Sequence, residues 1–400
     1  MIHSSNYKPR CYPYGSGGPA EIDRVQNLTT ALTLNREKIK EVGTEGTIDW
    51  KKRIPSLRMT ITQYEYGMIE FWRKLANQAT SNSIVLNDFK TSMIDVCGYK
   101  TDDNGTFLGT VWYPKLRLAG FSINIGDPQA YVERSIELVG EDETLFLNNN
   151  KYFIMREFTA NAGSNQTFTV SDGGTTYPNP VLDPDNSGVF LARVDRIRTG
   201  TPSTLTLTTD YSFNSSTQVL TVVTTNAGDL IRAYWTAGSY ITGENPFTTN
   251  TTDASALSAD FCSIYLESAN YLYKLQSVGI NVSFDRTDYY EIGADTIIQR
   301  GIRNKTCSIT LGRIIDAYTV EEVARGVAGS SYGKIDSRKY ADNLQLFVRL
   351  YSSAAKSTFL LKYHFTDLSP VSADTGTPVD DYISRGIVLE GEACTIATIL

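Results

Sequence analysis

The residues that could support catalysis are few and widely separated in this sequence. Two histidines occur, His3 near the N-terminus and His364 in the stretch LLKYHF, and the five cysteines stand at positions 11, 97, 262, 307 and 394. A Ser/His/Asp triad would have to use one of these histidines, and we interpret His364 as a packed or half-exposed strand residue. No H-E-x-x-H, C-x-x-C or G-x-x-x-x-G-K-[ST] motif is present. This inventory predicts no enzyme, no metal site and no cofactor.

Two glycine- or aspartate-rich stretches are better explained as turns than as ligand sites. GSGG at 15–18 is not preceded by a strand, and DPDNSG at 183–188 lacks the twelfth-position glutamate of a calcium-binding EF-hand loop. Neighbouring carboxylates occur in expected loops, where solvation accounts for them, at Asp102/Asp103, Glu141/Asp142 and Asp380/Asp381.

The composition is that of an ordinary globular protein with room for two or three domains. The 400 residues are 41% hydrophobic and 20% charged, and the formal net charge is −7. This charge argues against a protein that wraps DNA by neutralising phosphates, and solubility is its simplest explanation. No apolar run approaches the ~18 residues of a membrane span, and the first twenty residues lack the hydrophobic segment of a secretory signal. The odd, widely spaced cysteines predict a reducing compartment.

A stretch near the N-terminus recurs 250 positions later. Residues 24–43 read RVQNLTTALTLNREKIKEVG, and residues 274–293 read KLQSVGINVSFDRTDYYEIG. The register continues without a gap, and the identical pairs are Gln26/Gln276, Arg36/Arg286, Glu41/Glu291, Gly43/Gly293, Ile48/Ile298, Arg53/Arg303 and Thr60/Thr310. We infer an internal duplication, which decides the architecture before any local pattern.

Both copies of this stretch alternate between apolar and polar residues with a period of two. The apolar positions are Leu28, Leu32 and Leu34 in the first copy and Val278, Ile280, Val282 and Phe284 in the second. This alternation is typical of a strand with one buried face. The polar face requires a separate explanation, and it includes Thr33, Asn35, Ser283 and Asp285.

Each copy is predicted to continue with a long loop, further strands and one short helix. The loop spans 44–58 (counterpart 294–308), the second strand 59–62 (309–311), and strands 107–116 and 134–141 match 359–368 and 385–392. Helical spacing gives two apolar stripes, Met68/Phe71/Trp72/Leu75 and Val320/Val323/Ala324/Val327, the second after a T-x-x-E capping box at Thr319 and Glu322. We therefore predict an N-terminal arm at 1–21, module one at 22–150 and module two at 261–400.

The segment 151–260 has no counterpart and is predicted to be an inserted all-β domain. Leu205/Leu207, Leu220/Val222 and Ile231/Ala233/Trp235 alternate around the expected turns TDYSFN (209–214) and NAGD (226–229). The flanking stretches TANAGSNQT and GENPFTTNTTDAS have the composition of linkers. The predicted fold class is thus mainly β (α+β modules): two tandem modules of the β-barrel or sandwich type, each with one short helix, plus a small all-β insertion.

Each module resembles the tail tube protein of long-tailed bacteriophages. The resemblance rests on VQNLTTALTLNREKIKEVG with LRMTITQ, on LQSVGINVSFDRTDYYEIG with CSITLG, and on an insertion similar to tube decoration domains. It implies six modules in a ring, hence three duplicated chains with pseudo-sixfold symmetry, stacked as a hollow tube in the virion. It also implies partners of the tape measure, tail terminator and tail-tip or baseplate type, with DNA passing without specific binding and no membrane insertion. The protein would be made in the cytoplasm of the bacterial host.

The resemblance gives roles to two groups of residues. Thr33, Asn35, Ser283 and Asp285 would face the lumen or a neighbouring subunit. The loop would contact the ring above or below through Glu45, Asp49, Trp50, Lys51, Lys52 and Arg53. The alternatives are a tail-tip or baseplate ring protein of the same module type, an injection-apparatus tube protein, and a carbohydrate-processing or adhesin protein built from β domains. The last would have clustered tryptophans, whereas the four here, at positions 50, 72, 112 and 235, are scattered.

Overall fold

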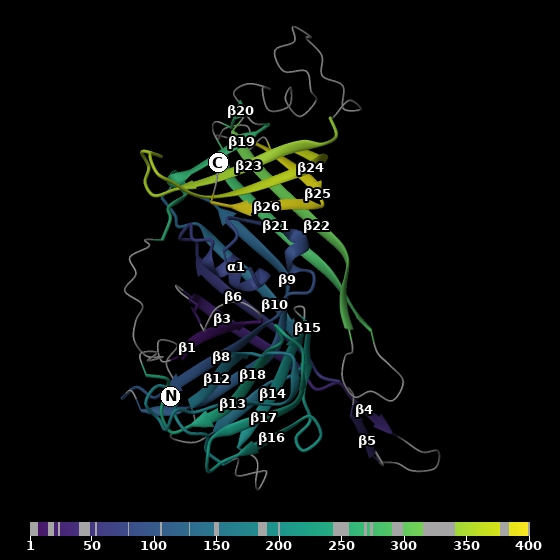
Figure 1. Cartoon of the computed structure of the whole chain (residues 1–400). Helices are drawn as coiled ribbons and strands as arrows, with labels where there is room; N and C mark the ends of the chain where they lie inside the picture. The colour runs from purple at the N-terminus through teal and green to yellow at the C-terminus, as the bar shows by residue number, and fades with distance from the viewer. Residues whose placement is uncertain are drawn as a thin grey trace, which may run out of the picture. The chain divides into compact units, whose positions relative to one another are not determined.

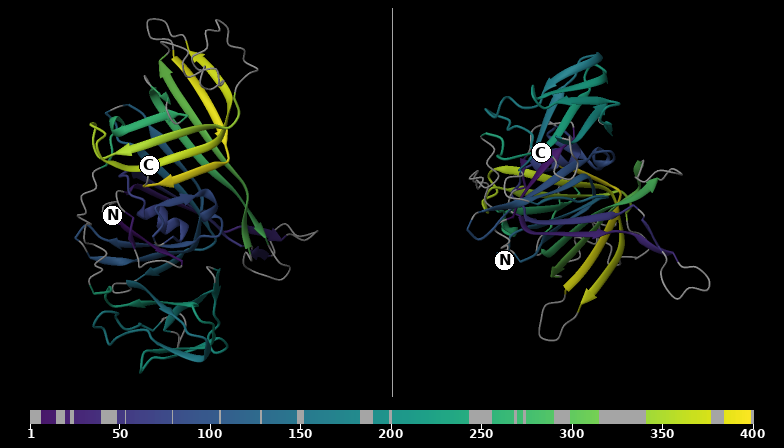
Figure 2. Two further views of the ribbon diagram at one scale, coloured as in Figure 1. Left: turned by 45° about the horizontal axis from the view of Figure 1, so that its top comes forward. Right: turned by 90° about the horizontal axis from the view of Figure 1, so that it is seen from below.

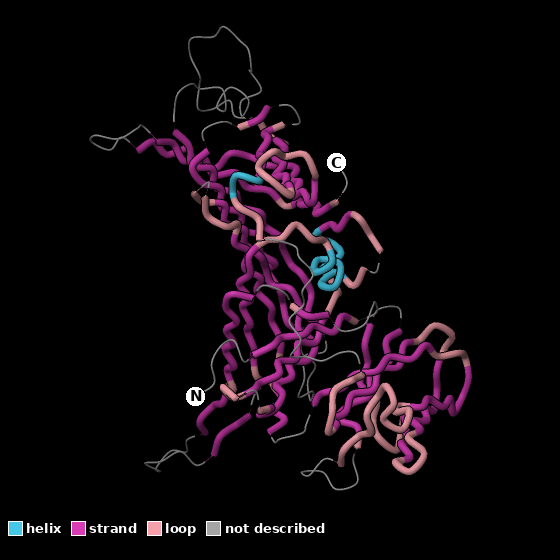
Figure 3. The backbone as a smooth tube through the Cα atoms, turned by 90° about the vertical axis from the view of Figure 1, so that its left-hand side faces the viewer, coloured by secondary structure: helices cyan, strands magenta, loops and turns pink. Residues whose placement is uncertain are grey.

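The computed structural model confirms a mainly β protein with one α-helix among the residues it describes. Most of the described chain is strand, labelled in Figure 1 and drawn magenta in Figure 3. The described residues are 7–14, 20–22, 25–39, 49–52, 54–78, 80–104, 106–127, 129–147, 152–182, 190–198, 201–242, 256–267, 270–272, 275–289, 299–314, 341–376 and 384–398. The chain forms two compact units. Unit 1 comprises 1–22, 91–116 and 140–251, and unit 2 comprises 23–90, 117–139 and 252–400.

Unit 2 is built around one continuous sheet of eight strands. In order across the sheet these are β3 (Val25–Thr33), β6 (Ser56–Tyr64), β10 (Glu133–Gly140), β9 (Phe107–Ile125), β21 (Leu275–Tyr289), β22 (Gln299–Ile314), β25 (Ser384–Gly391) and β24 (Phe359–Gly376). In Figure 2, β21 and β22 are among the green ribbons, and β24 and β25 are among the yellow ones. The buried strands alternate as the sequence predicts: β6 places Leu57, Met59 and Ile61 inward.

A second sheet of unit 2 uses the first part of β24. Its strands are β20 (Asn270–Tyr271), β19 (Cys262–Leu266), β23 (Leu344–Tyr351), β24, β26 (Ala393–Ala397) and β7 (Ser83–Val85). The short hairpin of β4 (Arg36–Ile39) and β5 (Asp49–Lys52) and the 3-10 turns η2 (Leu86–Phe89) and η3 (Ala259–Phe261) complete the unit.

The helix α1 (Glu70–Ala76) packs its apolar stripe into the core of unit 2. Phe71, Trp72 and Leu75 are buried, as predicted, whereas Met68 is 41% exposed because it precedes the helix. The Trp72 ring lies 4.8 Å from the ring of Phe121 on β9 and 6.2 Å from that of Tyr363 on β24. One indole therefore contacts strands from both sequence copies. The helix predicted around Val320–Val327 lies outside the described residues.

Unit 1 joins strands of the first sequence copy to the inserted domain. One sheet contains β2 (Ala20–Glu21), β1 (Tyr7–Pro13), β8 (Ile94–Thr101), residues 107–116 of β9, and β11 (Thr144–Leu147). The insertion has a four-stranded sheet, β12 (Tyr152–Thr159), β18 (Leu230–Ala237), β14 (Leu191–Arg198) and β15 (Thr201–Thr204). Its three-stranded sheet is β13 (Gly163–Thr169), β17 (Val219–Thr225) and β16 (Tyr211–Asn214).

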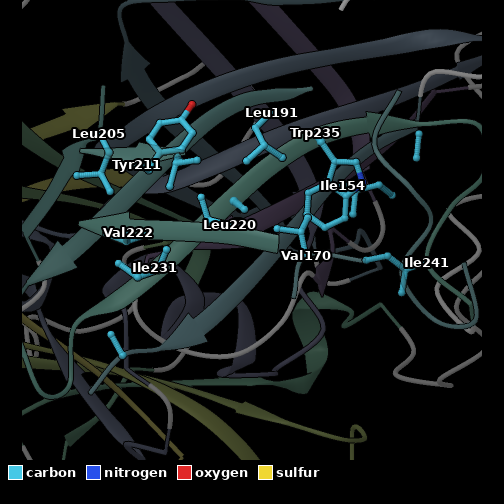
Figure 4. Close-up of a cluster of buried hydrophobic side chains, with 14 residues drawn as sticks. Ile154, Val170, Leu191, Leu205, Tyr211, Leu220, Val222, Ile231, Trp235 and Ile241 are labelled. Atoms are coloured by element: carbon cyan, nitrogen blue, oxygen red, sulfur yellow. The ribbon is translucent and has the colours of Figure 1, made fainter. Parts of the chain in front are cut away.

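The inserted domain has its own apolar core, as the alternating stretches predict. Ile154, Leu191, Leu220, Ile231 and Trp235 meet in this core and are all at most 2% exposed (Figure 4). Trp235 Nε1 donates to the carbonyl oxygen of Pro178 at 3.0 Å, so the one polar atom of the indole is satisfied.

The structure corrects four local predictions. Residues 7–13 of the expected arm form β1 and pair with β8. The expected loop 44–58 contains β5 and the first residues of β6, and 299–308 of its counterpart belong to β22. The expected linker TANAGSNQT contains the beginning of β13, and TDYSFN contains β16. In each case strand pairing overrides a polar, turn-rich composition, because sheet partners distant in sequence supply the hydrogen bonds.

Candidate assembly surface

The eight-stranded sheet consists of two four-stranded halves with the same strand order. The first half is β3, β6, β10, β9, and the second is β21, β22, β25, β24, each strand of one half matching a strand of the other. β3 and β6 precede β21 and β22 by 250 positions, and β10 precedes β25 by 251. The duplication therefore specifies a repeated sheet, and the halves join where β9 pairs with β21.

The duplication extends to an irregularity of the pairing. Ser135 and Ile136 of β10 face Ser122 and Phe121 of β9, and the register shifts between Glu137 and Leu138, which face Gly120 and Leu118. On β25 and β24, Val388 faces Ser372 and Leu389 faces Pro370, with the same one-residue skip. Ala119 and Val371 are the skipped residues, and they are 252 positions apart. A bulge conserved between the halves fixes the residue correspondence of β9 with β24 without reference to sequence identity.

The same correspondence gives a strand of the expected arm a counterpart in the second copy. Arg10 of β1 faces Cys97 of β8, and Tyr265 of β19 faces Phe347 of β23, which is 250 positions after Cys97. β1 is thus the counterpart of β19, but at an offset of 255, and β2 is the counterpart of β20 at 250. The change of offset explains why a fixed-offset comparison of the sequence missed β1.

The junction of β9 with β21 is a packed, fully paired antiparallel ladder. Six residue pairs, from Val278/Ile125 to Ser283/Gly120, face each other. Val282 is fully buried and faces Phe121, while the Phe284 ring lies 6.2 Å from that of Phe89. Gly120 allows the close approach, since a Cβ at this position would lie 2.7 Å from the Val282 carbonyl oxygen.

The Arg286 side chain binds backbone carbonyl oxygens at the end of this junction. Its Nε donates to the Leu118 carbonyl oxygen at 2.5 Å, and one Nη donates to the Phe89 carbonyl oxygen at 3.0 Å. A charged donor that binds two backbone carbonyl oxygens makes a strong contact.

Within the eight-stranded sheet, each outer strand has a neighbour on one side only among the described residues. β3 pairs with β6, and residues 369–376 of β24 pair with β25. Leu32 and Leu34 of the β3 stretch are 39% and 49% exposed, and Val371 beside the β24 edge is 54% exposed. The prediction that both copies bury the same face is confirmed for β21 and is wrong for Leu32 and Leu34. These leucines occupy an outer strand without the neighbour that covers β21.

One face of the sheet is lined by small polar side chains. A row of directly facing residues crosses five strands, namely Ser135, Ser122, Asn281, Ser308 and Glu390. The next row includes Ser283 and Thr306. Arg58 on this face is paired with Glu137 at 2.9 Å. These rows therefore present hydroxyl and amide groups together with the carboxylates of Glu390 and Glu137.

Of the residues predicted to face the lumen or a subunit, Thr33 ends β3 and Asn35 follows it, and Ser283 and Asp285 are the corresponding residues of β21. Thr33, Ser283 and Asp285 are exposed. Asn35 has a positive φ of 44°, and its side-chain amide donates to the Ile54 carbonyl oxygen at 2.8 Å. The extended strand is therefore interrupted between β3 and β4. In the second copy the ribbon of β21 and β22 continues through the same place. What these residues face in an assembly remains a prediction.

The predicted stacking residues lie mostly on the β4–β5 hairpin. Asp49, Trp50, Lys51 and Lys52 form β5, which pairs with β4 in the register of the outer end of β21 and β22. Glu45 and Arg53 lie outside the described residues. The β4–β5 hairpin is thus the first-copy counterpart of the outer end of the β21–β22 pair.

The groups that could do covalent or metal chemistry are packed as structural residues. His364 stacks on Phe347, with ring centroids 4.1 Å apart, and its Nε2 is 3.0 Å from Gln345 Oε1. The five cysteines are buried, and burial raises the pKa of Cys262 to about 12, so its thiol is protonated. The described residues contain no group of three metal-ligating side chains. GSSYG at 329–333 has G-x-S-x-G spacing, which our motif inventory missed, and lies outside the described residues.

Two buried ionic clusters also have structural roles. In unit 2, Arg134 binds Glu65 at 2.9 Å and Tyr363 donates to the same carboxylate at 2.7 Å, which ties β10 to β24. In unit 1, Arg193 binds Asp195 at 2.7 Å, lies 3.6 Å from Asp95 and stacks between Trp112 and Tyr234. These contacts attach β14 of the insertion to the module strand β8. Both carboxylates of unit 1 are fully buried, where they are inaccessible to a substrate.

Comparisons with known proteins add little to this geometry. No protein-family model matches the chain, and no curated protein matches it. Among solved structures, a chain described as "Cryo-EM structure of the anti-feeding prophage (AFP) baseplate, 6-fold symmetrised" aligns with 13% sequence identity and a TM-score of 0.28. The match covers 36% of this chain and 95% of that one, and at this level it identifies no function. In the described part of the chain no helix is long and apolar enough to cross a membrane.

Proposed function

We propose that this protein is a structural, non-enzymatic subunit of a phage-type tail that assembles into rings stacked as a hollow tube. The observation that carries the proposal is the repeated eight-stranded sheet, whose outer strands, β3 and residues 369–376 of β24, have a neighbouring strand on one side only among the described residues. A sheet edge presents unpaired N–H and C=O groups that invite pairing with another chain, and closure into a barrel removes such edges.

The polar face supports the passage of DNA through such a tube. DNA binding that is strong and salt-dependent requires lysine or arginine along the phosphate path. The rows from Ser135 to Glu390 instead present hydroxyls, an amide and a carboxylate, and Arg58 is neutralised by Glu137. A lining of this kind gives phosphates little to bind, so a duplex would slide along it.

The resemblance to tail tube proteins supplies the number of copies and the partners. Two modules a chain and six modules a ring give three chains with pseudo-sixfold symmetry. The tape measure, tail terminator and tail-tip proteins would be the neighbours in the virion. The β4–β5 hairpin would contact the next ring, a head-to-tail contact that propagates a filament.

Electron microscopy of the purified full-length protein, with its mass in solution, tests the proposal. Hollow tubes with three chains in each ring support it. Isolated rings that never stack at any concentration favour a tail-tip or baseplate ring protein instead. A monodisperse monomer up to millimolar concentration overturns it. Immunogold labelling along the tails of phage particles would separate a virion tube from the tube of a cellular injection apparatus.

A further inference from the structure

The junction inside the chain predicts the junction between chains. β9 is the last strand of the first half and receives β21, the first strand of the second half. β24 corresponds to β9, and β3 corresponds to β21. The outer edge of β24 therefore corresponds to the edge of β9 that pairs with β21, and β21 is the counterpart of β3.

We propose that the 369–376 edge of β24 in one copy receives β3 of a second copy in the register by which β9 receives β21, with Arg36 bound to the Pro370 carbonyl oxygen. The proposal rests on the proposed function for the existence of an assembly, and it specifies which residues meet there. With the 250- and 252-position correspondences, the four central facing pairs become Thr29/Gly376, Thr30/Thr375, Ala31/Asp374 and Leu32/Ala373.

Exposure of the first copy agrees with a missing neighbour. Val282 and Phe284 are 0% and 5% exposed beside β9, whereas Leu32 and Leu34 at the same places are 39% and 49% exposed. Ala373 is the residue that would lie opposite Leu32. Docking would remove the apolar surface of both leucines from water, which favours association by about 25 cal/mol for each square ångström.

Arg36 has the place of Arg286 but lacks its surroundings. Arg286 binds the Leu118 carbonyl oxygen at 2.5 Å, and the residue corresponding to Leu118 on β24 is Pro370. Arg36 is exposed at the start of β4. It faces Lys52 on β5, and Arg286 faces Ile302, the counterpart of Lys52, on β22. A second copy would bring a proline carbonyl to this guanidinium.

The two junctions differ at one position. Gly120 admits the Val282 carbonyl oxygen, where a Cβ would approach to 2.7 Å, but its counterpart on β24 is Ser372. Ser372 carries that Cβ, so the strands must separate slightly at the pair Thr33/Ser372. The inter-chain ladder is therefore expected to be looser at this end than the internal ladder.

Disulfide trapping in the full-length chain tests the register. Ala31→Cys with Asp374→Cys places one thiol on each predicted partner, both at exposed positions. Asn281→Cys with Ser122→Cys is the matched control, because this pair faces inside the chain at the corresponding place. Ala31→Cys with Ala373→Cys is shifted by one residue, which directs the two side chains to opposite faces. The wild-type chain controls for the five buried native cysteines.

Air oxidation of the assembled protein should form disulfides between chains at the Ala31/Asp374 pair. The product should be a closed multimer that a reductant separates. The control pair should link within one chain, and the shifted pair should link at least tenfold less than the first. Rings or tubes in which the Ala31/Asp374 pair stays reduced, or in which the shifted pair links as well, overturn this register while leaving the proposed function standing. A chain that is monomeric by mass and links only the internal control pair overturns both.

The arginine contact has its own matched pair. Arg36→Ala should raise the concentration needed for assembly about tenfold without changing the thermal stability of the monomer, given the strength of a charged hydrogen bond. Arg286→Ala should lower monomer stability instead. An Arg36→Ala protein that assembles at the wild-type concentration overturns the predicted Pro370 contact.

Discussion

Leu32 is 39% exposed, whereas Val282, the residue at the same place of the second sequence copy, is fully buried. The two residues occupy equivalent strands of equivalent half-sheets. The difference arises because β21 has β9 beside it and β3 has no such neighbour among the described residues. An identical substitution at the two places should therefore have opposite consequences for folding and assembly.

Aspartate at either position separates the two roles. Val282→Asp should unfold unit 2, because an unpaired carboxylate in the core costs several kcal/mol. Leu32→Asp should leave the thermal unfolding midpoint within about 2 °C of wild type and abolish higher-order assembly. Calorimetry and light scattering on both variants check this, with Leu32→Met as the assembly-competent control. Assembly of Leu32→Asp at wild-type concentrations would show that β3 does not carry the interface.

Gly120 should be far less replaceable than Gly279, although both lie on the joined strands. Gly120→Ala places a Cβ 2.7 Å from the Val282 carbonyl oxygen, while Gly279→Ala meets nothing nearer than 3.9 Å. The first substitution should cost about 1–3 kcal/mol of unfolding free energy and the second less than about 0.5 kcal/mol. Urea titration of both variants measures the difference. Equal losses would mean that the strands at this junction are farther apart than described.

The buried pair of Arg134 and Glu65 should stabilise unit 2 only while both partners are present. Arg134→Leu leaves the Glu65 carboxylate buried with the Tyr363 hydroxyl and two backbone N–H groups as its remaining partners. The expected loss is about 3–5 kcal/mol, read from urea unfolding. The double variant Arg134→Leu/Glu65→Leu should recover at least half of that loss, because no unpaired charge remains. A double variant as unstable as the single one would place the cost in packing instead.

Protonation of Asp229 in acid should lower the protection of the inserted domain against amide hydrogen exchange. Hydrogen bonding by Arg198, at 2.7 Å, together with the Asn226 N–H, holds the pKa of Asp229 below its usual value of 3.8. A carboxyl with a lowered folded-state pKa stabilises the domain above the unfolded-state pKa, and this contribution is lost as pH falls below about 4. Hydrogen exchange of the peptide covering β18 should accelerate between pH 5 and pH 3, after correction for intrinsic exchange. Asp229→Asn should flatten this pH dependence, and an unchanged profile would contradict the assignment.

The segment between β4 and β5 should govern stacking and not ring formation. Replacement of residues 40–48 by a short glycine-containing turn keeps both strands of the hairpin. Rings should still form, because β3 and β24 are untouched, but tube length in electron micrographs should collapse to one or two rings. A matched replacement of 290–298, between β21 and β22, tests whether the second copy shares the role. Tubes of wild-type length from both variants would exclude these segments from stacking.

The sequence by itself determined the class of the fold, the duplication and the alternation of the paired strands. These features depend on local periodicity and on a constant offset, as between Arg36 and Arg286, and both can be read without a partner strand. The stripe of Phe71, Trp72 and Leu75 was equally local.

Only the tertiary structure decided which strands meet and which edges stay open. β1 was missed as a module strand because its offset from β19 is 255, and the loop predicted at 44–58 hid β5 because its hydrogen bonds come from β4. No local pattern places Asn281 opposite Ser122, or Tyr363 on Glu65, since those contacts join residues far apart in the chain. Exposure of Leu32 and burial of Val282 follow from that pairing, because identical alternation gives a buried face only where a neighbouring strand covers it.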